Sequence, residues 1–317
     1  MGAFLMRSSW EKDSKIVAVA VAMIAAAGHA AGQSRMLPKV AAFRVDSKLV
    51  VVPVTVVDRR GATVRGLSSE VFNVTEDGVR QQIRSFSEEE APVSLGIVLD
   101  LSGSMKSVLG GAKESLQALT RDANPEDEAF LNAVSSSPRP YSSFTTRFDD
   151  LLRLVAFEDA SGNTALVDTL YASLQELRTG VNTRRALLVI SDGMDNHSRR
   201  SKGELLQLAM ESDAQIYTIV VSDPAKQYAK PMERTEEDRG RLFLDELSAK
   251  TGGLSFAVRS REDIGAAAAH IRQALRNRYT IGYVPIDNGR SGRWRAIKIT
   301  VARLGIRAYF RTEYRSN

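Results

Sequence analysis

The sequence predicts an α/β protein with a doubly wound, mainly parallel central sheet and a small flanking β-domain from its N- and C-terminal segments. Short apolar runs at residues 93–99 and 186–190 have the composition of strands buried on both faces. These runs alternate with segments of helical periodicity over residues 92–277, as in a doubly wound fold. The two ends of the chain, by contrast, carry β-branched or alternating apolar and polar residues, which predicts the flanking β-domain.

Each predicted element follows from its local pattern. Helices are expected at residues 107–121, 148–157, 165–177, 203–213, 240–250 and 261–277, and further central strands at 129–134, 215–221 and 254–258. Flanking strands are expected at 48–57, 71–75, 79–86, 279–284, 294–301 and 305–314. Pro53 favours an edge position for the first of these, because proline cannot donate to a sheet ladder.

The predicted domain boundaries follow from the same patterns. Residues 31–91 form an N-terminal β-region and linker, residues 92–277 the α/β domain, and residues 278–317 the C-terminal strands. Neither β-segment is large enough to hold a core alone, so we expect the two to pack together.

The N-terminus has the pattern of a secretory signal peptide over residues 1–30. Basic residues precede an apolar run at 16–28, and small residues follow at Ala30 and Ala31. The run is shorter than the roughly 20 residues of a membrane-spanning helix. We therefore expect the protein to be extracytoplasmic, periplasmic or secreted; an N-terminal membrane anchor is the alternative.

Composition excludes several classes of chemistry. The chain of 317 residues contains no Cys, so disulfides, Cys-ligated metals and thiol catalysis are ruled out. Its net charge of +5 is unevenly distributed: residues 272–317 hold eleven basic and two acidic residues, whereas residues 31–271 hold 29 basic and 34 acidic ones. The basic C-terminal strands are expected to present a solvated face or to contact an acidic surface. No nucleic-acid-binding motif accompanies them.

Oxygen-bearing side chains follow two of the predicted central strands. Asp100, Ser102 and Ser104 come directly after residues 93–99, Asp192 follows residues 186–190, and Thr164 lies in a loop that opens a helix. Ligands of open parallel sheets bind beyond the carboxyl ends of the strands. Carboxylate and hydroxyl oxygens are the ligands that hard divalent cations prefer. The alternative to a metal site is a set of ordinary turn residues in which Ser104 caps the following helix.

These five residues in this order resemble the metal-ion-dependent adhesion site of von Willebrand factor type A domains. The resemblance covers residues 92–277; Asn163 departs from it, because Gly is frequent there in the family. More narrowly, stretches such as residues 50–56, 186–193 and 279–283 are similar to bacterial von Willebrand factor A-related proteins of the acidobacterial type.

The resemblance implies a role for each residue. Ser102 and Ser104 would contact a divalent cation directly, Asp100 and Asp192 would balance its charge, and Thr164 would coordinate when a ligand is engaged. The cation would be Mg²⁺, with Mn²⁺ or Ca²⁺ as alternatives, and an unknown partner protein would supply a carboxylate.

The predicted function is therefore a non-enzymatic, metal-dependent, adhesion-type protein-binding module. Two alternatives stay open. The first is a metal-assisted phosphohydrolase with Asp100 as nucleophile, although Ser102 occupies the place where such an enzyme needs an acid/base. The second is a subunit of an intracellular motor or chelatase assembly, against which the signal segment argues.

Overall fold

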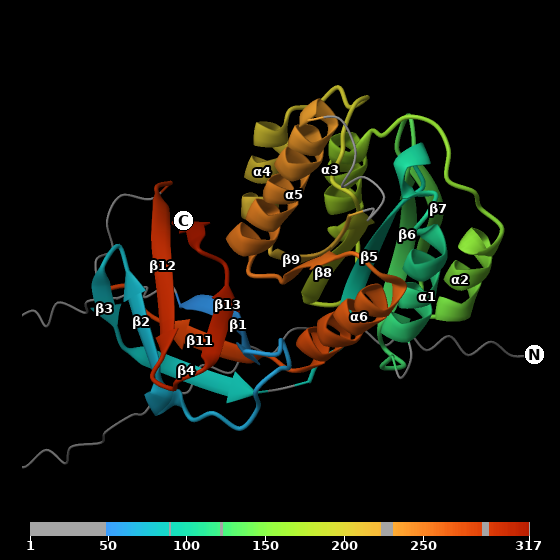
Figure 1. Cartoon of the computed structure of the whole chain (residues 1–317). Coiled ribbons are helices and arrows are strands. Elements are labelled where there is room, and N and C mark those ends of the chain that lie inside the picture. Colours follow the sequence, from blue (N-terminus) through green and yellow to red (C-terminus); the bar gives the residue numbers. More distant parts are fainter. Residues whose placement is uncertain (1–48, 89, 121–122, 223–230, 287–291, 317) are drawn as a thin grey trace, which may run out of the picture. The chain divides into compact units, whose positions relative to one another are not determined.

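The structure, a computed structural model, describes residues 49–88, 90–120, 123–222, 231–286 and 292–316. The largest sheet within these residues is the central one. Its six strands lie in the order β10-β9-β8-β5-β6-β7 (Figure 1). All neighbouring strands are parallel except β6 and β7. Every residue of β5 is buried, as its continuous apolar sequence predicts. The strands are β5 (Val93–Asp100), β6 (Glu128–Val134), β7 (Arg139–Thr145), β8 (Arg184–Ser191), β9 (Ala214–Val221) and β10 (Ser255–Val258).

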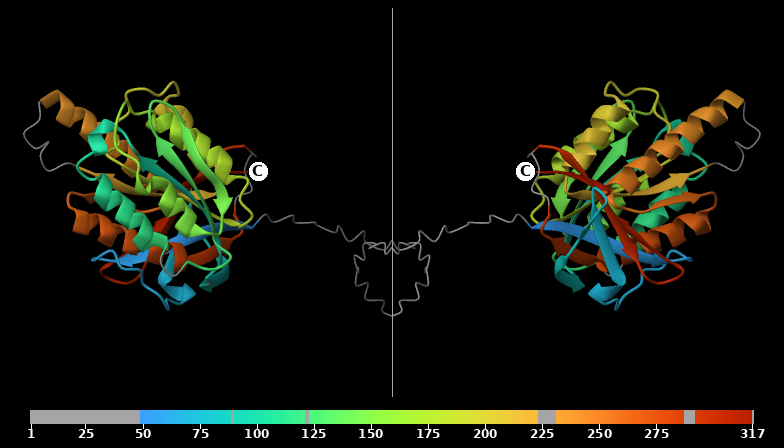
Figure 2. Two further views of the ribbon diagram at one scale, coloured as in Figure 1. Left: turned by 90° about the vertical axis from the view of Figure 1, so that its right-hand side faces the viewer. Right: turned by 90° about the vertical axis from the view of Figure 1, so that its left-hand side faces the viewer.

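Helices cover both faces of this sheet (Figures 1 and 2). Because successive strand residues point to opposite faces, Ile97 and Leu99 of β5 belong to one apolar cluster and Val98 to another. The first cluster is completed by α1 (Leu109–Thr120), α2 (Phe148–Ala156) and α6 (Arg261–Arg276). The second is completed by α3 (Leu166–Leu177), α4 (Lys202–Glu211) and α5 (Pro231–Thr251).

Strands from the two ends of the chain pair with one another. One sheet has the order β13-β1-β11-β4 and another the order β14-β12-β2-β3, and a third apolar cluster joins them through residues such as Val54, Phe72 and Ile299. The predicted fold class is thus confirmed, flanking β-structure included. The strands are β1 (Val50–Asp58), β2 (Phe72–Glu76), β3 (Val79–Gln81), β4 (Ile83–Glu88), β11 (Tyr279–Tyr283), β12 (Trp294–Val301), β13 (Ile306–Phe310) and β14 (Glu313–Arg315).

The predicted edge position of the first strand is wrong. β1 lies between β13 and β11, but β13 pairs with it only from Val54 onward. Pro53 lies in the part of β1 that precedes this pairing. Proline is accommodated there because that side of the strand has no ladder to complete.

Local patterns also missed some breaks between strands. Predicted strand 79–86 divides into β3 and β4, which belong to different sheets, and β7 was not predicted at all. The signal segment lies outside the described residues. Within the described ranges, no helix combines the length and apolarity that crossing a bilayer requires.

The close approach of the chain after α5 to the backbone of β9 gives a test of this packing. A Cβ atom at Gly253 would lie 1.9 Å from the carbonyl oxygen of Ile216, so Gly253→Ala must displace β9. We expect the free energy of unfolding to fall by about 2 kcal/mol or more, measured by urea denaturation. Gly265→Ala is the matched control, because nothing lies within 4 Å of its Cβ position in α6. That variant should be neutral or more stable by up to about 1 kcal/mol; equal destabilisation of both variants would refute the close approach.

Candidate metal centre

The candidate site lies where the chain changes direction across the central sheet. β5 and β8 are adjacent and parallel, the connection from β5 leads to β6 on one side, and the chain from β8 leads to β9 on the other. Such a reversal opens a crevice at the carboxyl ends of the two strands. Asp100 ends β5 and Asp192 follows β8 directly, and both are buried. The sheet topology therefore brings two carboxylates from distant parts of the sequence to one place.

The loop after β5 is organised around the Asp100 carboxylate. Its Oδ1 accepts a hydrogen bond from the Ser102 backbone N–H at 2.9 Å, and its Oδ2 accepts one from the Ser191 hydroxyl at 2.6 Å. The hydroxyls of Ser102 and Ser104 lie 3.1 Å apart. Ser104 belongs to the short 3-10 helix η2 (Gly103–Met105) and lies five residues before α1, so it does not cap α1. The helix-cap alternative is therefore wrong for this residue.

Backbone hydrogen bonds tie the Thr164 loop to the other two loops. Ser161 N–H donates to the Leu101 carbonyl at 2.8 Å, which joins it to the β5 loop. On the other side, Thr164 N–H donates to Asn196 Oδ1 at 2.9 Å, and the Thr164 carbonyl accepts from the Asn196 N–H at 3.0 Å. All five predicted residues thus lie on three loops that are bonded directly to one another.

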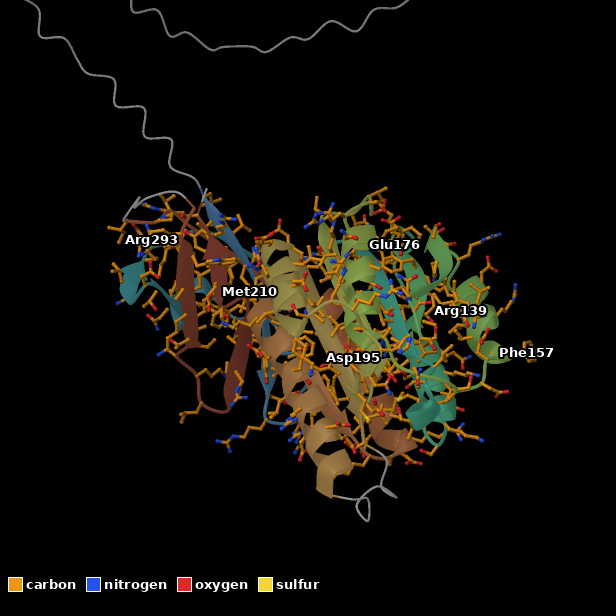
Figure 3. The ribbon with its side chains drawn as sticks, turned by 90° about the horizontal axis from the view of Figure 1, so that it is seen from above. Arg139, Phe157, Glu176, Asp195, Met210 and Arg293 are labelled. Atoms are coloured by element: carbon orange, nitrogen blue, oxygen red, sulfur yellow. The ribbon has the colours of Figure 1, made fainter. Side chains whose placement is uncertain are left out.

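Two acidic residues hold the segment after β8 against α3. Asp195, which lies in the loop after β8 (Figure 3), accepts from the N–H of Val167 in the first turn of α3 at 3.3 Å. Asp168 of α3 accepts from the N–H groups of Arg199 and Arg200, both at 3.0 Å. Neither residue is among the predicted site residues; the density of Asp and Asn directly after Asp192 is a signal that could have found Asp195.

A glycine at the turn of this loop allows α5 to approach it. Gly193 has a φ of +80°, and a Cβ atom there would lie 2.6 Å from the backbone of Gly240 in α5. Both the conformation and the close contact require glycine. Each residue of the Ser-Asp-Gly sequence therefore has a role: Ser191 donates to Asp100, Asp192 accepts from the Met194 N–H and lies near enough to Asp100 to repel its charge, and Gly193 makes the turn.

Electrostatics makes this a favourable place for a cation. Burial, together with the charge of Asp192, raises the pKa of Asp100 from 3.8 to about 6, against the opposing hydrogen bonds from Ser191 and Ser102. Two buried carboxylates that repel each other cost free energy at neutral pH, and a nearby cation removes that cost.

The donor set fits a hard divalent cation that is held in part by groups from outside the chain. No cluster of three or more His, Cys, Asp or Glu side chains with metal-site geometry occurs among the described residues. Two carboxylates and three hydroxyls leave positions for water or an external ligand, as Mg²⁺ sites in proteins commonly do. The residues present are consistent with an open site rather than a closed, all-protein cage.

Acidic residues partly neutralise the basic segment 272–317. Arg311 pairs with Asp213 at 3.0 Å, Arg295 with Asp77 at 3.0 Å, and Arg276 with Asp127. Arg295 is itself buried, so this residue does not belong to a solvated strand face.

Comparison with known proteins finds a similarity in the central part of the chain. The family model for the von Willebrand factor type A domain matches residues 95–194, which include all five candidate residues. No curated protein matches the chain. Among solved structures, a von Willebrand factor type A protein from Catenulispora acidiphila is 11% identical, with 86% of this chain and 74% of that chain covered and a TM-score of 0.49.

Two further solved structures are similar to part of the chain. BatB from Bacteroides thetaiotaomicron is 17% identical, with 57% of this chain and 98% of that chain covered and a TM-score of 0.45. The corresponding domain of the type V pili tip protein Mfa5 from Porphyromonas gingivalis is 12% identical, with 59% and 95% covered and a TM-score of 0.47.

The bonds between Asn196 and Thr164 give a test of how the loops are held. Asn196→Ala removes the acceptor of the Thr164 N–H, and we expect the free energy of unfolding to fall by about 1 kcal/mol. Chemical denaturation measures this. Asn163→Ala is the matched control, because Asn163 is an exposed residue of the Thr164 loop. It should change the free energy of unfolding by less than about 0.5 kcal/mol. If the two variants are equally stable, the amide does not hold the loop.

Proposed function

We propose that the chain is a metal-dependent protein-binding module whose site is formed by Asp100, Ser102, Ser104, Thr164 and Asp192. The match of residues 95–194 to the family model for the von Willebrand factor type A domain supports this proposal. The observation that carries the proposal is the placement of two buried, mutually repelling carboxylates beside paired serine hydroxyls at a sheet switch point. The narrower bacterial subfamily stays a prediction.

In the proposed site, side chains of the protein and a carboxylate of the partner would together bind the divalent cation. The Ser102 and Ser104 hydroxyls, 3.1 Å apart, would hold the ion directly, and Asp100 and Asp192 would offset its charge. The bonds that fix Thr164 between the other two loops would hold its hydroxyl ready. A bound divalent cation supplies positive charge that attracts a carboxylate of the partner protein.

A hydrolytic role for Asp100 is not favoured by its surroundings. The residue is fully buried, and both carboxylate oxygens accept hydrogen bonds. A nucleophilic oxygen must reach the substrate, and the Asp100 carboxylate has no exposed surface. We therefore propose a non-enzymatic role, and hydrolysis of a simple phosphate ester that Asp100→Asn abolishes would overturn it.

We propose that the protein works outside the cytoplasm, on the basis of the apolar run at residues 16–28 and the small residues after it. Mass measurement of the chain recovered from the producing cells tests this. An N-terminus near residue 30 supports export by a cleaved signal.

Metal titration tests the candidate centre. An excess of Mg²⁺ about 100-fold over its dissociation constant should stabilise the protein by about 2.7 kcal/mol, which raises the melting temperature by roughly 5 °C. Asp192→Asn keeps an oxygen for the Met194 N–H bond but removes one charge, so its melting temperature in EDTA should equal or exceed that of the unaltered chain. It should gain nothing from Mg²⁺, Mn²⁺ or Ca²⁺.

The control for this titration is Asp149→Asn, an exposed carboxylate in the first turn of α2. It carries the same charge change and should respond to metal like the unaltered chain. A metal response that survives in Asp192→Asn contradicts the proposed site.

Partner binding should depend on the same residues. Extracytoplasmic proteins retained on the immobilised chain in Mg²⁺ should be released by EDTA and should not bind the Asp192→Asn chain. Amidation of the partner's carboxylates with a carbodiimide and an amine should abolish retention. Retention that survives both chelation and amidation would show that binding uses another surface.

A further inference from the structure

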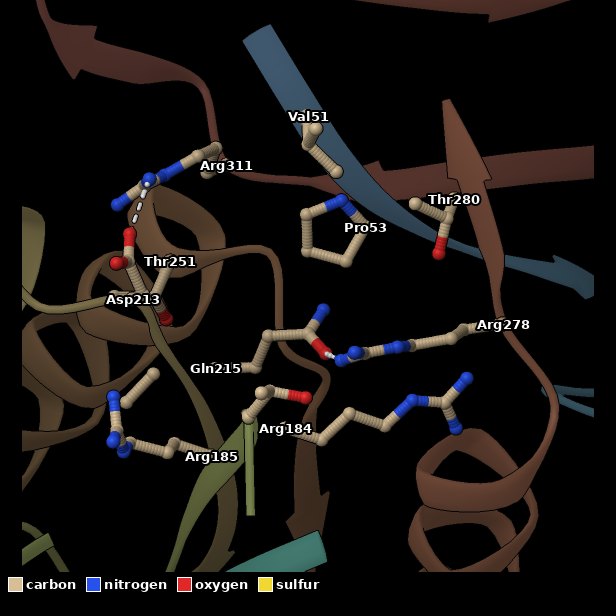
Figure 4. Close-up of a pocket in the computed structure, with 12 residues that line it drawn as sticks. Val51, Pro53, Arg184, Arg185, Asp213, Gln215, Thr251, Arg278, Thr280 and Arg311 are labelled. Atoms are coloured by element: carbon tan, nitrogen blue, oxygen red, sulfur yellow. Dashed lines mark hydrogen bonds and ion pairs between the residues drawn. The ribbon is translucent and has the colours of Figure 1, made fainter. Parts of the chain in front are cut away.

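A second concave site lies at the opposite edge of the central sheet. The parallel strands β8 and β9 begin there with Arg184 and Ala214, whereas the candidate metal centre lies at the carboxyl ends of β5 and β8. A cavity of about 280 Å³ opens between these strand starts and the part of β1 around Pro53 (Figure 4). This volume is close to the lower end of small-molecule sites, which is about 300 Å³.

Arginines dominate the lining of the cavity. Four of them and a single aspartate line it: Arg184 and Arg185 of β8, Asp213 just before β9, Arg278 just before β11 and Arg311 just after β13. Asp213 is engaged by Arg311 at 3.0 Å (Figure 4). The cavity therefore carries a net positive charge within a single compact unit formed by residues 46–317.

Two of these guanidinium groups have donors that the described residues do not satisfy. The Nε atoms of Arg278 and Arg185 are buried and have no hydrogen-bond partner in the part of the chain that the structure describes. The bonds recorded for their other nitrogens are long and go to uncharged oxygens: Arg278 to Gln215 Oε1 and Arg185 to the Gly180 carbonyl, both at 3.4 Å. Buried donors of this kind are rare in folded proteins, so the chain itself does not fully satisfy these two guanidinium groups.

The charge of Arg278 is held at a free-energy cost. Burial, with the nearby charge of Arg184, lowers the pKa of Arg278 to about 10. An arginine that loses stability to desolvation and repulsion is more costly than an uncharged residue of similar size. An anion in the cavity would offset both effects.

We propose that this cavity binds a phosphate-class oxyanion, as inorganic phosphate or as the phosphoryl group of a small ester. A phosphate offers oxygens in several directions and can accept from guanidinium groups that approach from different strands, whereas a carboxylate offers two oxygens in one plane. Arginine is the residue that matches such oxyanions through paired donors. The site is independent of the candidate metal centre.

The cavity also joins two parts of the fold. Arg278 lies in the two-residue connection, residues 277–278, between α6 and β11, and Pro53 and Thr280 line the cavity from β1 and β11. Arg185 belongs to the central sheet. An anion in the cavity would therefore lie between the flanking sheet and the central one, and its binding should raise the melting temperature of the whole unit.

Calorimetric titration of the full chain with sodium phosphate tests the proposal. EDTA is present throughout, so that phosphate cannot bind through a metal ion at the candidate metal centre. Titration with sodium chloride of equal ionic strength is the blank. We expect saturable binding that weakens by about tenfold or more in Arg278→Gln and in Arg185→Gln. Arg303→Gln, an exposed arginine after β12, carries the same charge change and should bind like the unaltered chain.

Further measurements distinguish inorganic phosphate from a phosphate ester and show whether the variants fold. Tighter binding of glycerol phosphate than of inorganic phosphate assigns the site to a small ester, and the reverse assigns it to the free ion. Without phosphate, Arg278→Gln should melt no lower than the unaltered chain, because it removes a costly charge; if it fails to fold, Arg185→Gln carries the test. Absence of saturable binding, equal or tighter binding of acetate, or an equal loss in Arg303→Gln would overturn the proposal.

Discussion

The parallel pairing of β5 with β8 is the constraint on which the candidate site depends. It places the carboxyl ends of two buried strands side by side, so that Asp100 lies near Asp192. Ser191, which directly precedes Asp192, is 91 positions after Asp100 in the sequence. The register of the pair sets Ser191 beside Asp100 and allows the 2.6 Å hydrogen bond between them. Burial then makes the carboxylates costly to keep charged, which is the condition under which a cation contributes most.

Hydrogen bonds within the surrounding loops hold the candidate site residues in position. Asn196 fixes Thr164, Asp195 reaches the first turn of α3, and Asp168 holds the start of the segment that leads to α4. None of these side chains needs to contact an ion to matter. Ligands are oriented by the bonds of the residues behind them, and loss of such bonds weakens metal sites.

Much of the fold and the candidate site could be predicted from local patterns. The buried strands β5, β8 and β9 have sequences that fit few other environments, and the Asp-x-Ser-x-Ser and Ser-Asp-Gly loops follow directly from their ends. β7 escaped prediction because its sequence, Arg139–Thr145, is polar and contains Pro140, as an exposed edge strand allows. The inner position of β1 depends on pairing with β13, some 250 residues away, which no local pattern encodes.

The arginine-lined cavity could not be predicted for the same reason. Arg185 and Arg278 are far apart in the sequence, and each resembles an ordinary surface arginine when read alone. Their juxtaposition follows from the sheets that carry them. The basic charge of the C-terminal segment therefore divides into ion pairs, such as that of Arg295 with Asp77, and a cavity at the amino edge of the central sheet.

The two edges of the central sheet thus differ in chemistry: buried carboxylates lie at the carboxyl edge and arginines at the amino edge. The most direct test of the candidate centre is a crystal structure of the chain grown with Mn²⁺, with the ion located by its anomalous scattering. We predict one ion bonded to the hydroxyl oxygens of Ser102 and Ser104 at about 2.0–2.2 Å, close to Mg²⁺–oxygen distances. An ion bound elsewhere, or none at this edge of the sheet, would contradict the assignment.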